Sequence, residues 1–199
     1  RKLPAKVGRE RNPVRFLLAK LLVKTGACRH LGIQRDGYRL CFHPSAMSST
    51  LWIGSDDRRD DERVLERFLK PGDTFVDIGA NIGSLSLKAA SLVGSNGRVT
   101  AIEAHPRTFG FLEHNVAINP FRNIALHNCA LGDKKGTLLF ANQASDDQNC
   151  IVDHGTANSI PVEVQTLDEF ELKEIDLLKI DVEGYEKFVF QGASHTLAR

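Results

Sequence analysis

The sequence predicts an α/β fold in which a parallel sheet carries helices on both faces. From about residue 73 onward, short apolar runs alternate with segments of helical periodicity. A glycine-rich loop also joins the first of these runs to the helix that follows it. Strands that alternate with helices pair in parallel, because each crossover helix packs back onto the sheet. The composition, with 42% hydrophobic and 26% charged residues in a chain of 199, is typical of a globular protein.

The first part of the chain is basic. Residues 1–40 hold 11 Lys and Arg against Glu10 and Asp36, although the whole chain has a net charge of only +1. We expect a unit of residues 1–50, with a helix and short strands, to pack on a main domain of residues 51–199. A basic patch can meet nucleic acid or an anionic membrane surface. Because aromatic residues are not interleaved with these charges, we expect neither partner.

Within the first unit, apolar residues at helical spacing predict a helix over residues 14–25. Residues 36–53 are typical of short strands joined by turns. No apolar run approaches the roughly 18 residues that a membrane-spanning helix needs.

Cysteine and histidine spacing does not predict a metal site. No two of the four cysteines have C-x-x-C spacing, which favours a reduced, cytoplasmic protein without zinc. The histidines also lack ligand spacing, and we expect surface or core roles for His30, His43, His114, His127, His154 and His195.

The main domain begins with a predicted helix over residues 56–70, which ends before Pro71 and Gly72. Its expected inner face comprises Val64, Leu65, Phe68 and Leu69. Parallel strands are then predicted at residues 73–79, 98–104, 123–131 and 175–182, and helices at residues 83–94, 106–119 and 185–198. Residues 136–141 and 160–167 have no helix between them and predict an antiparallel insertion.

A loop between Gly79 and Gly83 follows the first of these strands and opens a helix, which is the usual place for a nucleotide or an anion. The next strand ends in Glu103, whose carboxylate can accept hydrogen bonds from a ribose. Both NAD and S-adenosylmethionine contain such a ribose. The spacing is G-x-x-x-G rather than G-x-G-x-x-G, with Asn81 in place of a glycine. In addition, Asp77 disfavours a pyrophosphate and suits the ammonium of a methionine moiety.

The segments "GDTFVDIGANIGSLSL", "GRVTAIEAHP", "HNCALGD", "TLDEF" and "LLKIDVEGYE" together resemble the FkbM family of S-adenosylmethionine-dependent methyltransferases. The resemblance runs from about Leu51 to the end of the chain. It implies a Rossmann-like class I methyltransferase fold. It also implies methyl transfer from S-adenosyl-L-methionine, typically to an oxygen of a small molecule or sugar.

The same resemblance implies roles for individual residues. The methionine end of the cofactor would be wrapped by Asp77, Gly79, Ala80, Asn81 and Gly83. Glu103 would hold the ribose. The adenosine would be bordered by Ala104, His105 and the backbone of Ala130 and Leu131. Asp181 would face the methyl donor.

Methyl transfer to an alcohol benefits from a general base. The candidates at the strand ends are Asp181, Glu183, Lys179 and His105. We favour Asp181, with Lys179 pairing with it or orienting the acceptor; a Lys179–Asp181 pair that only holds the strand end together is the alternative. Asp181 and Glu183 lack a clear third ligand, so we expect no metal.

The acceptor is not identified by these motifs. The long polar loop at residues 142–159 is the best candidate for an acceptor-binding lid. Phe42 and Trp52 are expected in the core rather than in an acceptor pocket. The alternatives to a methyltransferase are a nicotinamide-dependent oxidoreductase and a non-catalytic cofactor-binding module.

Class I methyltransferase sheets usually have seven strands, and four parallel strands are predicted here. The missing C-terminal strands suggest a truncated domain with its fourth strand at an edge. Because an open edge favours association, we expect the insertion or another chain to cover that edge if the domain is not a fragment.

Overall fold

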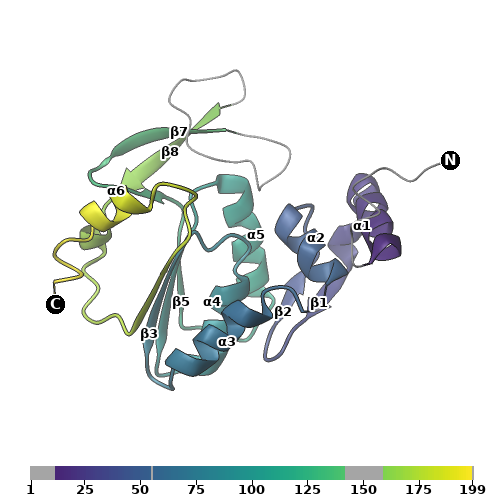
Figure 1. Cartoon of the computed structure of the whole chain (residues 1–199), viewed down its shortest axis with the longest axis horizontal. Coiled ribbons are helices and arrows are strands. Elements are labelled where there is room, and N and C mark those ends of the chain that lie inside the picture. Colours follow the sequence, from purple (N-terminus) through teal and green to yellow (C-terminus); the bar gives the residue numbers. More distant parts are fainter. Residues whose placement is uncertain (1–11, 55, 142–158, 199) are drawn as a thin grey trace.

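The computed structural model describes residues 12–54, 56–141 and 159–198 (Figure 1). The helices are α1 (Pro13–Thr25), η2 (Ala27–His30), α2 (Ala46–Ile53), α3 (Arg59–Phe68), α4 (Ser84–Val93), α5 (Pro106–Ala117), η4 (Leu167–Phe170) and α6 (Glu186–Gln191). The strands are β1 (Gly32–Gln34), β2 (Arg39–Cys41), β3 (Thr74–Ile78), β4 (Arg98–Ile102), β5 (Ile124–His127), β6 (Ala130–Leu131), β7 (Gly136–Ala141), β8 (Ser159–Gln165) and β9 (Leu177–Ile180).

The central sheet has the order β5-β4-β3-β9, and all of its strand pairs are parallel. The predicted α/β fold with four parallel strands is therefore confirmed for the described residues. β9 lies at one edge of this sheet among those residues. In the pairing of β3 with β9, Asp77 lies opposite Lys179.

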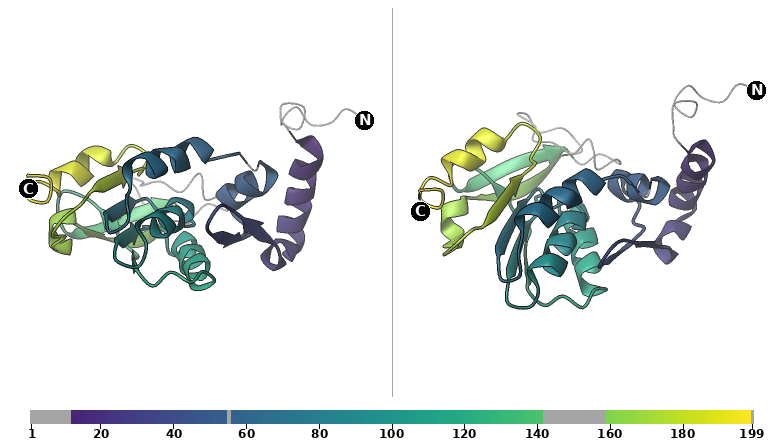
Figure 2. Two further views of the ribbon diagram at one scale, coloured as in Figure 1. Left: turned by 90° about the horizontal axis from the view of Figure 1, so that it is seen from below. Right: turned by 60° about the horizontal axis from the view of Figure 1, so that its bottom comes forward.

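Side chains alternate between the two faces of β3, as strand geometry requires. Phe75 packs against α3 and α4, whereas Val76 and Ile78 pack in a cluster with η4 and α6. Helices therefore cover both faces of the sheet, and Figures 1 and 2 show α3 and α4 away from α6. Both faces of β3 are buried, which explains its nearly continuous apolar sequence.

A second, three-stranded sheet has the order β6-β8-β7. The pairing of β7 with β8 is antiparallel, which confirms the predicted insertion. The single strand predicted over residues 123–131 is wrong, because this segment divides into β5 in the central sheet and β6 in the second sheet. Asn128 lies at the break, and its side-chain amide donates to the backbone oxygens of Glu103 and Ala104.

Two predictions for residues 36–68 need correction. Residues 46–53 form helix α2 rather than a strand, because the Ser45 side chain caps the helix by accepting from the Ser48 N–H. The predicted domain boundary at residue 50, which stays a prediction, falls inside this helix. On α3, Leu65 is buried as expected, but Val64 and Phe68 are exposed. The buried face of α3 also includes a charged residue, Glu62.

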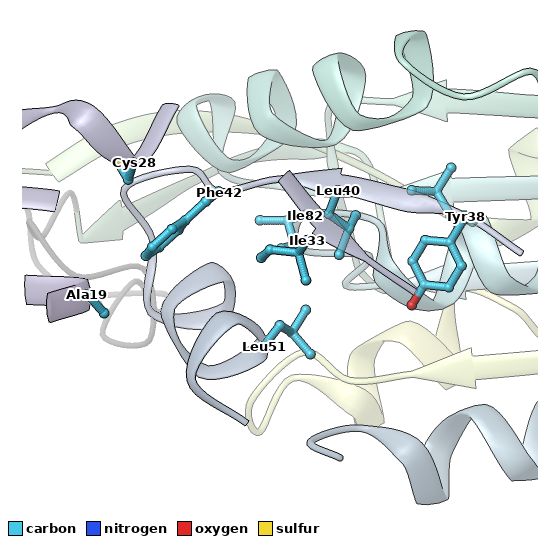
Figure 3. Packing of buried hydrophobic residues seen from close by; sticks show 9 residues of the cluster. Ala19, Cys28, Ile33, Tyr38, Leu40, Phe42, Leu51 and Ile82 are labelled. Carbon is cyan, nitrogen blue, oxygen red and sulfur yellow. The ribbon is translucent and has the colours of Figure 1, made fainter. Parts of the chain in front are cut away.

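The N-terminal elements share a hydrophobic cluster with the main domain (Figure 3). Leu40 and Phe42 from the first part of the chain are fully buried there with Ile82, which follows the glycine loop. Phe42 also stacks on Trp52, with 5.4 Å between the ring centroids. Both aromatic residues are thus part of this packing, as expected.

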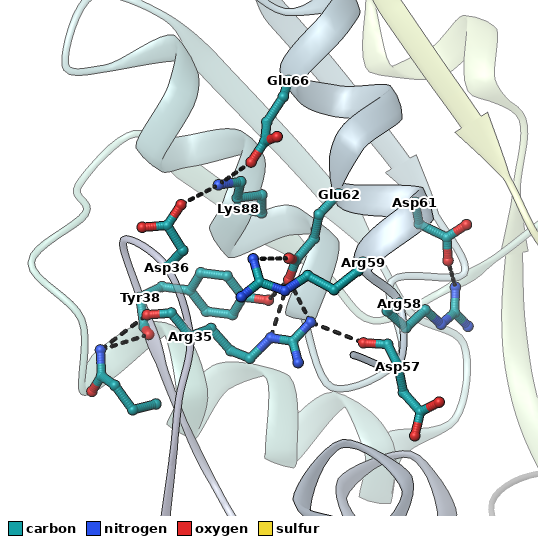
Figure 4. A network of polar contacts seen from close by, with 11 residues as sticks. Arg35, Asp36, Tyr38, Asp57, Arg58, Arg59, Asp61, Glu62, Glu66 and Lys88 are labelled. Atoms are coloured by element: carbon teal, nitrogen blue, oxygen red, sulfur yellow. Dashed lines mark hydrogen bonds and ion pairs between the residues drawn. The ribbon is translucent and has the colours of Figure 1, made fainter. Parts of the chain in front are cut away.

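A polar network ties β1 and β2 to α3 and α4 (Figure 4). Arg35 forms a buried ion pair with Glu62 at 2.9 Å, and the Tyr38 hydroxyl donates to the same carboxylate at 2.8 Å. Lys88 on α4 pairs with Glu66 at 2.7 Å and with Asp36 at 3.3 Å. The buried charges therefore have partners, as burial of charge requires.

Candidate functional site

A pocket of about 610 Å³ opens at the carboxyl ends of β3, β4 and β9. Its lining includes Gly79 and Asn81 after β3, Glu103 after β4, and Asp181 after β9. This is the edge at which open parallel sheets bind their ligands. The volume is within the usual range for a small-molecule site, about 300–1,000 Å³.

The glycine loop forms one wall of the pocket, and its tight turn requires left-handed backbone at three positions, Gly79, Asn81 and Gly83. Gly79 has a φ of 77°, and a Cβ there would overlap the backbone oxygen of Asp181. Asn81 also has a positive φ, 52°, and its side-chain oxygen accepts from the Ile82 N–H at 2.8 Å. Asparagine tolerates this conformation better than most residues. Asn81 can therefore stand where the dinucleotide-binding pattern has a glycine.

Glu103 links the loop to the end of β4. One carboxylate oxygen accepts from the Asn81 N–H at 2.9 Å, and the other accepts from the His105 N–H at 2.9 Å. Burial raises the pKa of Glu103, although these two N–H groups and Lys179 act in the opposite direction. Each carboxylate oxygen has a further lone pair, so Glu103 can still accept hydrogen bonds from a ligand.

Lys179 lies behind the glycine loop. Its Nζ donates to the Gly79 backbone oxygen at 2.7 Å and lies 3.0 Å from Oδ1 of Asp77. Asp77 is fully buried, and its other carboxylate oxygen accepts from Ser86 at 2.6 Å. Lys179 and Asp77 therefore hold β9, β3, α4 and the glycine loop together.

Asp181 lies on the pocket side of the same strand end, with half of its side chain exposed. Its carboxylate is 3.9 Å from Arg58 and 3.9 Å from Lys179. Lys179 is thus closer to Asp77 than to Asp181. Glu183, two residues on, lies in a left-handed turn with a φ of 48°.

The structure brings most of the expected site residues to one pocket. The predicted residues that line it are Gly79, Asn81, Glu103, Ala104, His105, Ala130, Leu131 and Asp181. Those that do not line it are Asp77, Ala80, Gly83 and Lys179. His105 caps α5, because its Nδ1 accepts from the Arg107 N–H at 3.2 Å. The predicted lid lies almost entirely outside the described residues.

Several pocket residues were missed by sequence reasoning. They are Ala46, Met47, Thr50, Arg58, Thr108, Cys129, Phe140, Tyr185 and Phe188. They come from α2, α5, β7, α6 and the segments between elements, and no spacing in the sequence links them. Tyr185 follows the end of β9 by five residues, and only the fold places it in the pocket.

Comparison with known proteins relates this chain to methyltransferases. A family model described as "Methyltransferase FkbM domain" matches residues 77–199, which is more than half of the chain. Methyltransferase 1 of Beauveria bassiana (strain ARSEF 2860) is 28% identical over 148 residues, covering 61% of this chain and 59% of that protein. The chain thus spans about three fifths of the length of this relative.

Solved structures resemble the chain more loosely. A methyltransferase FkbM from Methylobacillus flagellatus KT covers 93% of this chain and 46% of its own, with 17% identity and a TM-score of 0.47. A precorrin-6y C5,15-methyltransferase from Geobacter metallireducens GS-15 is 30% identical over 35% of this chain and 37% of its own, with a TM-score of 0.33. The extent of the family-model match decides the assignment: the chain belongs to the FkbM methyltransferase family.

Proposed function

We propose that this chain binds S-adenosyl-L-methionine in the pocket and transfers its methyl group to a hydroxyl oxygen of a small molecule or sugar. One observation carries the proposal. The left-handed glycine loop and the Glu103 carboxylate line the same cavity, at the end of the sheet where nucleotides bind. Family membership supports it.

The residues present fit this cofactor. Gly79 lets the loop pack directly on the backbone that follows β9, because a Cβ at this position would overlap the Asp181 oxygen. Glu103 has acceptor capacity for ribose hydroxyls, and the Ala130–Leu131 backbone borders the place expected for the adenine. When bound, the cofactor supplies an electrophilic methyl group on a sulfonium.

Lys179 and Asp77 have a positioning role in this proposal. Neither side chain lines the pocket, and each binds the other and the elements around it. The Gly79 oxygen accepts a hydrogen bond from Lys179, which fixes the position of the loop relative to β9. These residues would set the geometry of the methionine end without touching the acceptor.

Asp181 is our candidate for the general base. It is exposed to the pocket, and the positive charges of Arg58 and Lys179 face it. The carboxylate would take the hydroxyl proton as the acceptor oxygen attacks. Around it, Met47, Phe140 and Phe188 provide apolar surface for the body of an acceptor.

Calorimetric titration with S-adenosylhomocysteine tests the binding step, with NADH as the competing ligand class. We expect binding of the first and none of the second. Glu103→Gln should weaken S-adenosylhomocysteine binding by about 1–3 kcal/mol, whereas Glu113→Gln, on the exposed face of α5, should leave it unchanged. If the folded protein binds NADH instead, the oxidoreductase reading replaces this one.

The transfer step is tested with S-adenosyl-L-methionine and a panel of small molecules and sugars that carry hydroxyl, amino or thiol groups. We expect Asp181→Asn to keep the affinity for S-adenosylhomocysteine and to lose turnover of whichever acceptor the unaltered chain methylates. Full turnover by this variant would remove Asp181 from the role of base. Methylation confined to nitrogen or sulfur acceptors would contradict the proposed oxygen specificity.

A further inference from the structure

Cys41, His43 and His114 meet on the side of the molecule where the N-terminal elements pack on α5. Cys41 and His43 are buried, and His114 is exposed. Their ligand atoms, one sulfur and two imidazole nitrogens, all lie within 4.8 Å of one another. From this geometry we propose that the three residues bind a divalent transition metal of the zinc class.

The spacing of the three atoms is close to that of a tetrahedral site. His43 Nε2 and His114 Nδ1 are 3.3 Å apart. With the bond lengths usual for zinc, two nitrogen ligands lie roughly 3.3 Å apart, and a sulfur and a nitrogen roughly 3.6 Å apart. The two histidines already have this separation. Side-chain rotation that moves the Cys41 sulfur or the His114 nitrogen by about an ångström would bring the sulfur–nitrogen distances into this range.

Neighbouring side chains orient the buried histidine. The His43 ring stacks on Phe111, with 4.4 Å between centroids and an interplanar angle of 14°. Beside it, Asn115 fixes the backbone of the cysteine, because its Oδ1 accepts from the Cys41 N–H at 2.8 Å. Asn115 is fully buried and donates from Nδ2 to the Ile82 oxygen at 2.8 Å. Partners that fix ligand orientation in this way are typical of metal sites.

The donor set indicates the class of metal. One thiolate and two neutral imidazoles favour zinc, cobalt or copper over magnesium or calcium, which prefer oxygen ligands. The Cys41 thiol now donates to the Arg29 backbone oxygen, with a sulfur–oxygen distance of 3.4 Å. On binding, the sulfur would release one proton to solvent and form the metal–sulfur bond. Three protein ligands leave the fourth position to water.

The position of the cluster suggests what the metal would do. Cys41 ends β2 and His43 follows it, whereas His114 lies on α5, 71 residues away from His43. None of the three lines the cofactor pocket. A metal here would therefore link the N-terminal elements to the methyltransferase domain. Linear spacing did not predict such a site, because the third ligand comes from a distant helix.

Cobalt(II) gives a direct test, because thiolate coordination produces a charge-transfer band and tetrahedral geometry produces intense visible bands. The purified full chain is stripped with a chelator under reducing conditions and titrated with cobalt, then with zinc as competitor. We expect both sets of bands to saturate at one equivalent and to vanish when zinc is added. Absence of a thiolate charge-transfer band in the folded, reduced chain would overturn the proposal.

Three variants identify the ligands. Cys41→Ser should lose the charge-transfer band, and His114→Gln should weaken cobalt binding at least about tenfold. His30→Gln, at another exposed histidine, should change neither. Because His114 is exposed, its replacement decides the question even if Cys41→Ser does not fold. Bands that survive in both Cys41→Ser and His114→Gln would place the metal elsewhere and refute the site.

A stability measurement tests the linking role. Zinc should raise the midpoint of thermal unfolding of the unaltered chain and of His30→Gln, and it should not raise that of His114→Gln. Equal zinc stabilisation of all three would contradict the proposed linkage. This test does not involve S-adenosyl-L-methionine, so it stands apart from the proposed function.

Discussion

The Nζ of Lys179 lies 3.0 Å from Oδ1 of Asp77, and the two residues face each other across the paired strands β9 and β3. The same Nζ donates to the Gly79 oxygen at 2.7 Å. An ion pair between a fully buried carboxylate and a half-buried ammonium thus lies directly beneath the glycine loop. Removing one member of such a pair leaves the other charge buried without compensation, which is strongly destabilising.

We expect Lys179→Met to lower the free energy of unfolding by about 3–5 kcal/mol. Denaturant unfolding measures it, with Lys187→Met on the exposed side of α6 as the matched control. Adding Asp77→Asn to Lys179→Met should recover part of the loss, because the uncompensated charge is then removed. Asp77→Asn alone is the third member of this comparison. If the losses of stability in the two single variants simply add up in the double variant, the two residues do not act as a pair.

A second prediction concerns Gly79. Its φ of 77° disfavours any other residue, and a Cβ would overlap the Asp181 oxygen. Gly79→Ala should therefore cost at least about 1–3 kcal/mol of stability and weaken S-adenosylhomocysteine binding. Gly110→Ala is the control: nothing lies within 4 Å of its Cβ position on α5. In a helix this change should stabilise by about 0.5–1 kcal/mol, and equal effects of the two changes would refute the steric argument.

The pH dependence of cofactor binding should follow Glu103. Burial raises the pKa of this carboxyl, and its ionised form is the better acceptor for ribose hydroxyls. Affinity for S-adenosylhomocysteine should therefore be constant above the raised pKa and fall as the pH drops through it. Calorimetry between about pH 8 and pH 5 checks this. In Glu103→Gln the affinity should be weaker and this part of its pH dependence should be absent.

The raised pKa of Glu103 affects folding stability in the opposite direction: stability decreases, rather than increases, with rising pH. Between the ordinary pKa of a glutamate and the raised pKa, the folded chain binds more protons at Glu103 than the unfolded chain does. Its contribution to the free energy of unfolding therefore decreases as the pH rises through that window. Comparing the pH dependence of stability in the unaltered chain and in Glu103→Gln isolates this contribution. A contribution that increases with pH would contradict the raised pKa.

The last prediction compares a buried ion pair with an exposed one. Arg35 and Glu62 are both almost fully buried, and Arg59 and Tyr38 also contact the Glu62 carboxylate. Arg35→Met should destabilise by about 3–5 kcal/mol, because Glu62 loses its closest cation. Denaturant unfolding provides the measurement.

The exposed pair of Arg63 and Asp60, both on α3, is the control. Asp60→Asn should change the free energy of unfolding by less than about 1 kcal/mol, because solvent screens the charges. A similar effect of Arg35→Met and Asp60→Asn would show that burial does not decide the strength of these pairs.

Local patterns in the sequence predicted much of the fold correctly. The alternation of strands and helices after residue 73 reflects the periodicities of 2 and 3.6 residues, which depend only on backbone geometry. The loop at Gly79–Gly83 and the acidic residue at Glu103 likewise follow from their order along the chain. Residues 46–53 were predicted as strand, because β-branched and aromatic residues within them favour strands. They form a helix, because the Ser45 cap that begins it outweighs this preference.

The partners of individual charges depended on the tertiary structure. Lys179 and Asp181 are two residues apart on one strand, and an ion pair between them was predicted. The closest charged partner of Lys179 is Asp77 instead, at 3.0 Å against 3.9 Å for Asp181. Arg58 borders the pocket, and His114 joins Cys41 and His43, although they come from separate segments. Sequence periodicity reports which face of one element a residue occupies. Which other element lies against that face is decided by packing between distant parts of the chain, and that is what the tertiary structure added.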